Sequence, residues 1–201
     1  MKRLTRILIM TFAAVALVPP LQSSAAPTSQ PLTLAQAFAE HAVKIRASAT
    51  TATAADCYAA TITSQANGHL TSAELGYDPS DYRYGMLRAR ATSEGPWEEF
   101  FVCFNGSQST IQSLDTGMYV SAELGYDTSD SRWGMLRARA SSAGPWEQYS
   151  FATSCNGNCL VIRSTANNRL VSAELGYGTS DWRYEMLRAR ATSEGPWEEF
   201  N

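Results

Sequence analysis

A block of 29 residues occurs three times in this chain of 201 residues, at positions 72–100, 121–149 and 172–200. The first copy reads SAELGYDPSDYRYGMLRARATSEGPWEEF, and the third copy differs from it at only four positions. This repetition predicts one body built from similar lobes, because a single copy cannot bury its own apolar face. Any site inside the block then exists up to three times.

Each copy predicts four short strands. An Asn67-Gly68 pair, or its equivalent, follows the first strand and suits a tight hairpin turn. The second strand runs into Ser-Ala-Glu, and the third strand reads Leu-Arg-Ala-Arg-Ala. Alternation along the third strand predicts that Leu87, Ala89 and Ala91 lie on one face and that Arg88 and Arg90 lie on the other.

A Gly-Pro-Trp-Glu motif breaks the chain before the fourth strand. We expect Trp97, Trp146 and Trp197 to open this strand and to pack under their lobes, since large aromatic side chains usually contribute to the core. Stacking against sugar rings is the alternative role for these tryptophans. Three copies of four strands predict a closed all-β body, because pairing around a ring removes sheet edges.

The combination of the Asn-Gly turn, Ser-Ala-Glu, Leu-Arg-Ala-Arg-Ala and Gly-Pro-Trp-Glu-x-Phe resembles the fascin-like β-trefoil repeat. It is most similar to the repeats of secreted bacterial proteins and of modules attached to glycoside hydrolases. The resemblance covers residues 57–201 and implies a β-trefoil with lobes at about 57–104, 105–154 and 155–201. It also implies glycan binding, with up to one site in each lobe.

The third copy departs from this pattern at its end. The first copy continues past Phe100 as Phe-Val-Cys-Phe, whereas the third copy is followed only by Asn201. The last strand is therefore expected to be short. Either the barrel closes imperfectly at this point, or residues 47–57 cover the gap.

Residues 1–26 predict a secretory signal peptide. Lys2, Arg3 and Arg6 precede an apolar run at 7–18, and small residues suitable for cleavage follow. This run is too short to span a bilayer, which needs about 20 residues. We therefore expect a secreted, extracellular protein without membrane insertion; a retained membrane anchor is the alternative.

Residues 27–56 form an Ala-, Thr- and Ser-rich segment before the repeats. Thr33 can cap a short, possibly helical stretch through Arg46. Its apolar stripe would consist of four residues: Leu34, Phe38, Ala42 and Ile45. Residues 47–55 then have the composition of a linker. The segment could be a spacer, a pro-segment or a helix packed on the domain.

Charge and cysteine content narrow the classes of partner. Without the signal peptide the chain keeps 13 basic and 19 acidic residues, a net charge of about −6. Such a chain has no general attraction to nucleic acid or to anionic lipid. Export favours disulfides, and we expect the pairs Cys57–Cys103 and Cys155–Cys159. A zinc site is not expected, because neither histidine lies near a cysteine in the sequence.

The loop between the second and third strands is the predicted place for recognition, because loops on a rigid scaffold commonly carry binding groups. Sugar binding needs an aromatic face and polar groups for the hydroxyls, and each copy of the loop supplies both. The predicted ligand-binding residues are Glu74, Tyr77, Asp81 and Tyr84 in the first copy, Glu123, Tyr126, Asp130 and Trp133 in the second, and Glu174, Tyr177, Asp181 and Tyr184 in the third.

Structural roles are open for the same residues. Asp81 and its equivalents could cap the turn, Glu74 could pair with Arg88 or Arg90, and Tyr77 could seal its lobe. Repetition does not decide between the two roles, since recent duplication alone would keep most positions identical. In the second copy Ser131 stands where the other copies have aromatic residues, so a site there is expected to be weaker or to select another sugar.

The sequence favours a non-catalytic, lectin-like protein that binds a polysaccharide, such as a β-glucan by resemblance, at several sites. A catalytic pair of carboxylates need occur only once, whereas the acids here recur with the repeat. No cofactor is expected. A secreted protein-interaction module, such as an inhibitor or an adhesin, is the first alternative, and a glycan-active enzyme is the second. The oligomeric state is left open.

Overall fold

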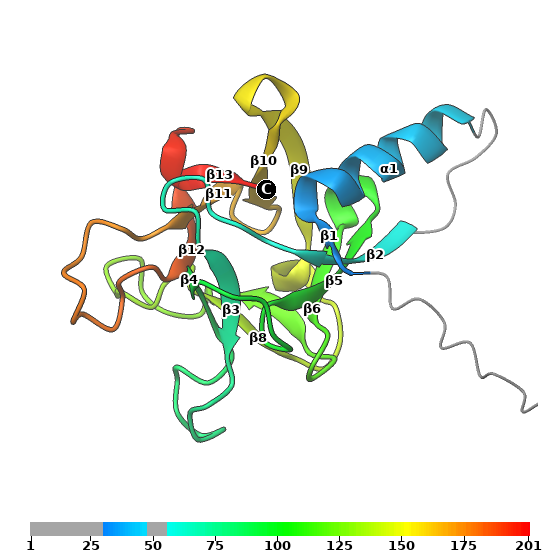
Figure 1. The fold of residues 1–201 in the computed structure, drawn as a ribbon. Coiled ribbons are helices and arrows are strands. Elements are labelled where there is room, and N and C mark those ends of the chain that lie inside the picture. Colours follow the sequence, from blue (N-terminus) through cyan, green and yellow to red (C-terminus); the bar gives the residue numbers. More distant parts are fainter. Residues whose placement is uncertain (1–29, 48–55) are drawn as a thin grey trace, which may run out of the picture. The chain divides into compact units, whose positions relative to one another are not determined.

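The computed structural model describes residues 30–47 and 56–201 (Figure 1). The predicted signal peptide at 1–26 lies outside the described residues, as do residues 48–55 of the predicted linker. Residues Pro31–Asn201 form one compact unit. Within the described ranges, no helix is long and apolar enough to cross a membrane.

Each lobe contains four strands, as predicted. They are β2 (Asp56–Thr61), β3 (Leu70–Glu74), β4 (Met86–Ala91) and β5 (Glu99–Phe104) in the first lobe; β6 (Thr110–Ser113), β7 (Tyr119–Ala122), β8 (Leu136–Ala140) and β9 (Tyr149–Ser154) in the second; and β10 (Cys159–Ser164), β11 (Arg169–Ala173), β12 (Leu187–Ala191) and β13 (Glu199–Phe200) in the third. Two further elements precede them: β1 (Leu32–Thr33) and α1 (Leu34–Ala47).

The first and fourth strands of the lobes close into a barrel. β5 pairs with β2 and β6, and β9 pairs with β10 and, through Tyr149, with Ser109. β13 pairs with β10 and, through Phe200, with Ser64. The second and third strands form three hairpins, β3–β4, β7–β8 and β11–β12. A barrel of this kind with three associated hairpins is a β-trefoil.

The core is built from equivalent residues of all three lobes. Leu87, Leu136 and Leu187 come from the third strands and are buried, as alternation predicted. The fourth strands contribute three further buried rings: Phe100, Tyr149 and Phe200. Burying one such side chain contributes roughly 1.5–3 kcal/mol, so no lobe is expected to be stable without its neighbours.

The predicted arginine face of the third strand is not wholly exposed to solvent. Arg88 and its equivalents, Arg137 and Arg188, are buried. Each guanidinium donates to a backbone carbonyl of another lobe: Arg88 to Tyr184 at 2.6 Å, Arg137 to Tyr84 at 2.8 Å and Arg188 to Trp133 at 2.7 Å. The three lobes meet here around their pseudo-threefold axis, so this face of the third strand is a contact between lobes and not a solvent face.

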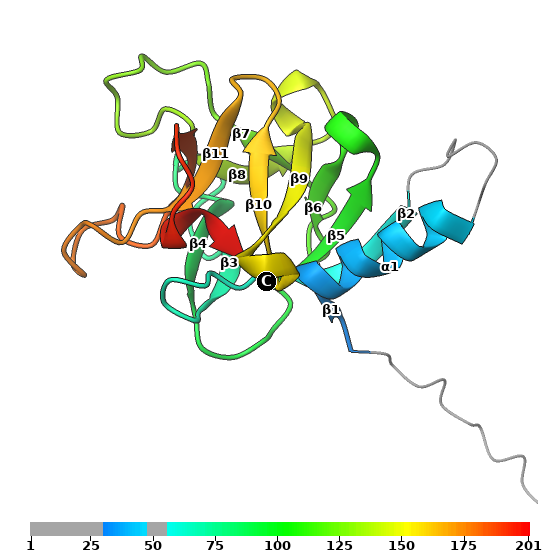
Figure 2. The same ribbon diagram turned by 90° about the horizontal axis from the view of Figure 1, so that it is seen from above.

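The helix begins where the sequence predicts. The backbone N–H of Gln36 donates to the Thr33 hydroxyl, and the side chain of Gln36 accepts from the Thr33 N–H, which is a reciprocal capping arrangement. Leu34 and Ala37 are fully buried in the barrel core, and Phe38 packs edge-on against Phe104. Figure 2 shows α1 beside β2 and β5. The described part of the N-terminal segment therefore packs on the trefoil.

β1 occupies the place of the missing end of the last strand. In the first lobe, Phe100 pairs with Ser113 and the rest of β5 continues along β6. Phe200 pairs with the equivalent residue Ser64, but the described strand ends there. Leu32 and Thr33 pair with Ala60 and Thr61 instead, parallel to β2. Residues 32–33 thus cover the gap; of residues 47–57, which were expected there, 56–57 begin β2 and 48–55 lie outside the described residues.

Both predicted disulfides are confirmed. Cys57 and Cys103 are directly opposite each other in the register of β2 and β5, with their Cα atoms 3.9 Å apart. Cys155 and Cys159 bridge the turn between β9 and β10, with their Cα atoms 5.4 Å apart. A cross-link reduces the freedom of the unfolded chain, and the longer loop closed by Cys57–Cys103 is expected to stabilise more.

Candidate functional site

The predicted glutamates lie at the C-terminal ends of the second strands and are buried. Each pairs with an arginine of its own lobe: Glu74 with Arg90, Glu123 with Arg139 and Glu174 with Arg190. The Arg90 guanidinium donates to Glu74 at 2.5 Å, and the pairs in the other lobes are bidentate. Burial raises the pKa of Glu74, and the charge of Arg90 opposes that rise. These carboxylates hold the second strand to the third.

The predicted aspartates organise the loop itself. Asp81 accepts bonds from the Arg83 side chain, at 2.8 Å, and from the Arg83 backbone N–H; Asp130 and Asp181 hold Arg132 and Arg183 in the same way. These bonds, above all those from the arginine side chains, lower the pKa of each aspartate to about 2. The arginines lie over the predicted tyrosines, with centroid distances of 4.3 Å at Tyr77, 4.2 Å at Tyr126 and 4.2 Å at Tyr177.

The last predicted position of the loop is occupied by Tyr84, Trp133 and Tyr184, and these three side chains are half-buried. The carbonyls of Tyr84, Trp133 and Tyr184 receive the cross-lobe arginines described above. Tyr84 also lines a hollow of about 500 Å³ that contains Asp81 and, from the second lobe, Tyr126. The structure thus brings three predicted residues together between two lobes, and ligand contact by any of the predicted residues stays a prediction.

The expectation that the motif tryptophans pack under their lobes is wrong. Trp97, Trp146 and Trp197 are 38%, 36% and 40% exposed. In the second and third lobes, Pro-Trp-Glu forms one 3-10 turn. The following strand begins two residues after the tryptophan in the first and third lobes and three residues after it in the second. Proline at the first position of a short helix has its backbone φ already set, which favours this turn over a strand.

A signal for this orientation is present in the sequence. Alternation in β5 buries Phe100 and Val102, and counting back by two from Phe100 places Glu98 inside and Trp97 outside. Glu98 is indeed only 8% exposed. A glycine faces each tryptophan ring: a Cβ on Gly76 would lie 3.2 Å from the end of the Trp97 ring. The ring therefore rests against the loop and leaves part of its surface to solvent.

The tryptophans of the first and third lobes each border a hollow, which we call Trp groove 1 and Trp groove 3. Trp groove 1 has a volume of about 420 Å³ and is lined by Trp97, Arg90, Glu94, Glu98 and Ser72 together with neighbouring loop residues. Trp groove 3 has a volume of about 350 Å³ and is lined by the equivalent residues Trp197, Arg190, Glu194, Glu198 and Ser172. Sugar stacking is the alternative role predicted for Trp97 and Trp197, whereas the other lining residues are not among the predicted ligand-binding residues.

The buried glutamate of each motif anchors the turn. In the second lobe, the Gly144 backbone N–H donates to the Glu147 carboxylate at 2.7 Å. Burial raises the pKa of the equivalent Glu198, opposed by hydrogen bonds from Ser172 and the Gly195 backbone. The carboxylate therefore fixes the tryptophan turn and also lies in the wall of its groove.

The second lobe differs from the others at two groove positions: Ser141 stands in place of Thr92 and Thr192, and an acidic residue is lost. Glu94 and Glu194 line the grooves of the first and third lobes, whereas the second lobe has Ala143. Within the described residues, the Glu94 side chain has no hydrogen-bond or ion-pair partner, whereas the Ser154 hydroxyl donates to Glu194 and, at 3.0 Å, to Glu199. The two otherwise similar grooves thus hold this carboxylate differently.

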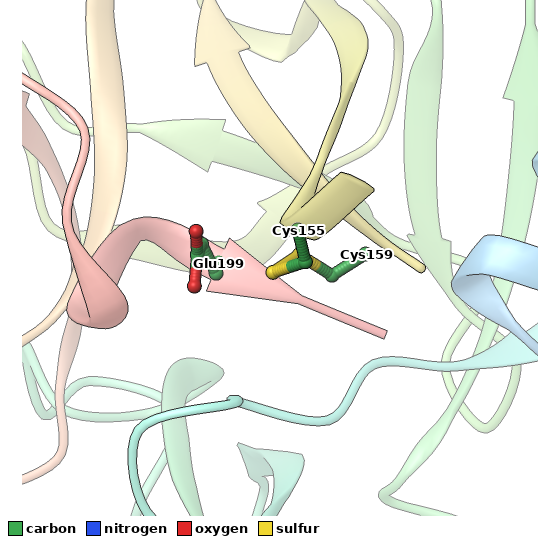
Figure 3. A group of neighbouring side chains, drawn as sticks. All are labelled: Cys155, Cys159 and Glu199. Atoms are coloured by element: carbon green, nitrogen blue, oxygen red, sulfur yellow. A yellow bond between two sulfur atoms is a disulfide. The ribbon is translucent and has the colours of Figure 1, made fainter. Parts of the chain in front are cut away.

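Glu199 lies beside the Cys155–Cys159 disulfide (Figure 3). Atoms of metal-ligand type from these three residues lie within 4.8 Å of one another. Both sulfurs are bonded to each other, so neither is a thiolate that could bind a metal. The cluster therefore supports the edge of Trp groove 3 through Ser154 and is not a metal centre in this oxidised state.

Comparison with solved structures decides the fold. A designed 3-fold symmetric protein, ThreeFoil, has a TM-score of 0.55 and 16% identity, with 70% of this chain and 94% of that chain covered. The chain is a β-trefoil protein. A Macrolepiota procera ricin B-like lectin solved with lactose has a TM-score of 0.52 and 16% identity, over 76% of this chain and 97% of the lectin.

The same fold carries another activity elsewhere. A proteinase inhibitor from Coprinopsis cinerea has a TM-score of 0.51 and 12% identity, over 71% of this chain and 94% of the inhibitor. Identities this low show the fold alone. The sequence matches no family model and no curated protein sequence, so the resemblance to fascin-like repeats stays an expectation from the motifs.

Proposed function

We propose that this β-trefoil protein is a non-catalytic carbohydrate-binding protein that holds polysaccharide in Trp grooves 1 and 3. One observation carries the proposal: an exposed tryptophan borders an equivalent polar hollow in two lobes. A sugar ring presents C–H bonds on one face and hydroxyls around its edge. Trp97 offers a surface for the face, and Arg90 with Glu98 offers hydrogen-bonding groups for the hydroxyls.

Two grooves on one rigid body suit a polymeric ligand. Each groove is open to solvent, so a single sugar exchanges water contacts for protein contacts and gains little free energy. A polysaccharide that reaches both grooves binds the second one at a high effective concentration. The proposal includes secretion, which the signal-peptide pattern supports. It also includes a β-glucan or similar polysaccharide as the ligand, which the motif resemblance supports.

The hollow between the first and second lobes is a further candidate for sugar contact. It contains the predicted residues Asp81, Tyr84 and Tyr126, and Arg137 and Arg139 lie in its wall. Both arginines already have partners, Arg137 on the Tyr84 carbonyl and Arg139 on Glu123. The Trp-groove arginines are paired in the same way, so we rank this hollow lower for another reason: Arg132 already lies over its Tyr126 ring, with a centroid distance of 4.2 Å.

Affinity electrophoresis of the chain without residues 1–26 tests the proposal. Gels contain β-1,3-, β-1,6- or mixed-linkage glucan, xylan, mannan or no glycan. We expect retardation in at least one glycan gel and its loss when Trp97→Ala and Trp197→Ala are combined. The matched control combines Tyr84→Ala with Tyr126→Ala, and loss of retardation only in this control would move the site to the hollow between the lobes. Absence of retardation in every gel, followed by absence of binding to soluble amino-sugar oligomers, would contradict glycan binding.

A further inference from the structure

Trp grooves 1 and 3 both carry uncompensated negative charge. In Trp groove 1 the charge of Arg90 is compensated by Glu74, whose carboxylate it contacts at 2.5 Å. Glu94 and Glu98 also line the groove, and neither forms an ion pair with any cation of the described ranges. Trp groove 3 repeats this composition with Glu194 and Glu198, while Arg190 pairs with Glu174. Both grooves are therefore net acidic beside an exposed indole ring.

A second observation distinguishes this from an ordinary acidic surface. Glu98 and Glu198 are each only 8% exposed, yet they line the grooves. A ligand that covers such a carboxylate removes its remaining water, which costs free energy unless the ligand returns a hydrogen bond or a positive charge. A neutral sugar can return only hydroxyl bonds. A cation returns both a charge and donors, and it is also attracted to the face of the indole.

We propose that Trp grooves 1 and 3 select sugar units that carry a protonated amino group, as in a deacetylated amino-sugar polymer. The inference rests on the proposed function and names its ligand class. The sugar ring lies against Trp97, and its ammonium group faces Glu94 and Glu98. The same arrangement holds at Trp197 with Glu194 and Glu198.

The second lobe lacks the outer glutamate and therefore serves as an internal comparison for its role. It keeps the tryptophan, the arginine and the buried glutamate as Trp146, Arg139 and Glu147, but has Ala143 in place of the outer glutamate. Its groove position therefore has one carboxylate fewer. We expect the second lobe to show little preference for an amino sugar over a neutral one.

Isothermal titration calorimetry of the chain without residues 1–26 tests this inference with three soluble probes. The probes are tetramers of glucosamine, of N-acetylglucosamine and of β-1,3-linked glucose, each at low and high salt. We expect the glucosamine tetramer to bind about tenfold more tightly than the other two, since one charge-assisted hydrogen bond commonly contributes this much. High salt should reduce this preference, because it screens exposed charges.

Two sets of variants identify the residues. Combining Glu94→Gln with Glu194→Gln should abolish most of the preference for the glucosamine tetramer over the two neutral tetramers. The reverse change, Ala143→Glu, should add a third amino-sugar site and raise the stoichiometry from two to three. Failure of both effects would overturn the assignment of the ammonium site.

The remaining outcomes separate the inference from the proposed function. Equal affinity for all three tetramers, lost on combining Trp97→Ala with Trp197→Ala, would overturn the amino-sugar inference and support glycan binding. No binding of any tetramer or gel polysaccharide would overturn both. Tighter binding of a lysine oligomer, unaffected by these tryptophan substitutions, would identify a peptide surface and also overturn the inference.

Discussion

The loop between the second and third strands and the turn before the fourth strand contain similar kinds of side chain, but the fold uses them differently. In the loop, Asp81 holds Arg83, Arg83 lies over Tyr77, and the Tyr84 carbonyl receives Arg137 of the next lobe. In the turn, Trp97 is left partly exposed and Glu94 has no partner among the described residues. Repeated aromatic and charged residues therefore do not mark a site by themselves. Their partners inside the fold show which of them remain for a ligand.

The largest effect on stability is expected from the loop contacts. Arg137→Ala leaves the Tyr84 carbonyl without its charged donor and opens space between lobes, so the free energy of unfolding should fall by about 2–3 kcal/mol. Urea unfolding measures this change. Trp97→Ala should cost less in the same assay, because part of the ring is already exposed to solvent. An equal loss in both variants would show that the tryptophan is a core residue after all.

The next effect concerns affinity. Trp97→Ala should weaken binding to a retarding polysaccharide or amino-sugar tetramer by about tenfold at Trp groove 1, because the stacking surface is removed. Tyr84→Ala should change affinity by less than about threefold if the loop is structural. Titration of single-groove proteins that carry Trp197→Ala gives both values. The opposite ranking would place recognition in the loop.

A smaller effect concerns acid stability. The folded-state pKa values of Asp81, Asp130 and Asp181 are about 2, below the ordinary value of 3.8, so their contribution is complete above about pH 4 and is lost as the pH falls towards 2. Combining Asp81→Asn, Asp130→Asn and Asp181→Asn should make the melting temperature depend less on pH between about pH 4 and pH 2. Burial raises the pKa of Glu74 and Glu198, and this effect favours the folded state at low pH in both proteins. The quantity to measure is therefore the difference in melting temperature between the unsubstituted protein and the triple variant at each pH.

The smallest expected effect distinguishes the two grooves. Ser154→Ala releases Glu194 and makes Trp groove 3 resemble Trp groove 1, where Glu94 has no partner among the described residues. In a Trp97→Ala background, the affinity for the glucosamine tetramer should rise by about threefold, equivalent to losing one modest hydrogen bond. Unchanged affinity would show that the Ser154 contact does not compete with a ligand.

Much of the lobe was predictable because its signals are local. The repeat and the alternation of Leu87 with its neighbours indicated a three-lobed all-β fold. The positive φ angles of Gly68, Gly117 and Asn168 confirm the predicted hairpin turns, since these residue types tolerate that conformation. The alternation of β5, extended back to Trp97, also indicates that this side chain points outward, although its size suggested a core position.

The sequence by itself determined the repeat, the strands, the cap at Thr33 and plausible cysteine pairs, because these depend on residues near one another or on compartment. Only the tertiary structure decided that Arg88 is buried, since its acceptor on Tyr184 is 96 residues away. It likewise decided that β1 pairs beside β2 and that Glu74 is neutralised by Arg90 whereas Glu94 is not. A side chain becomes available to a ligand only when the rest of the fold does not satisfy its charge or cover its surface, and those partners come from distant parts of the chain.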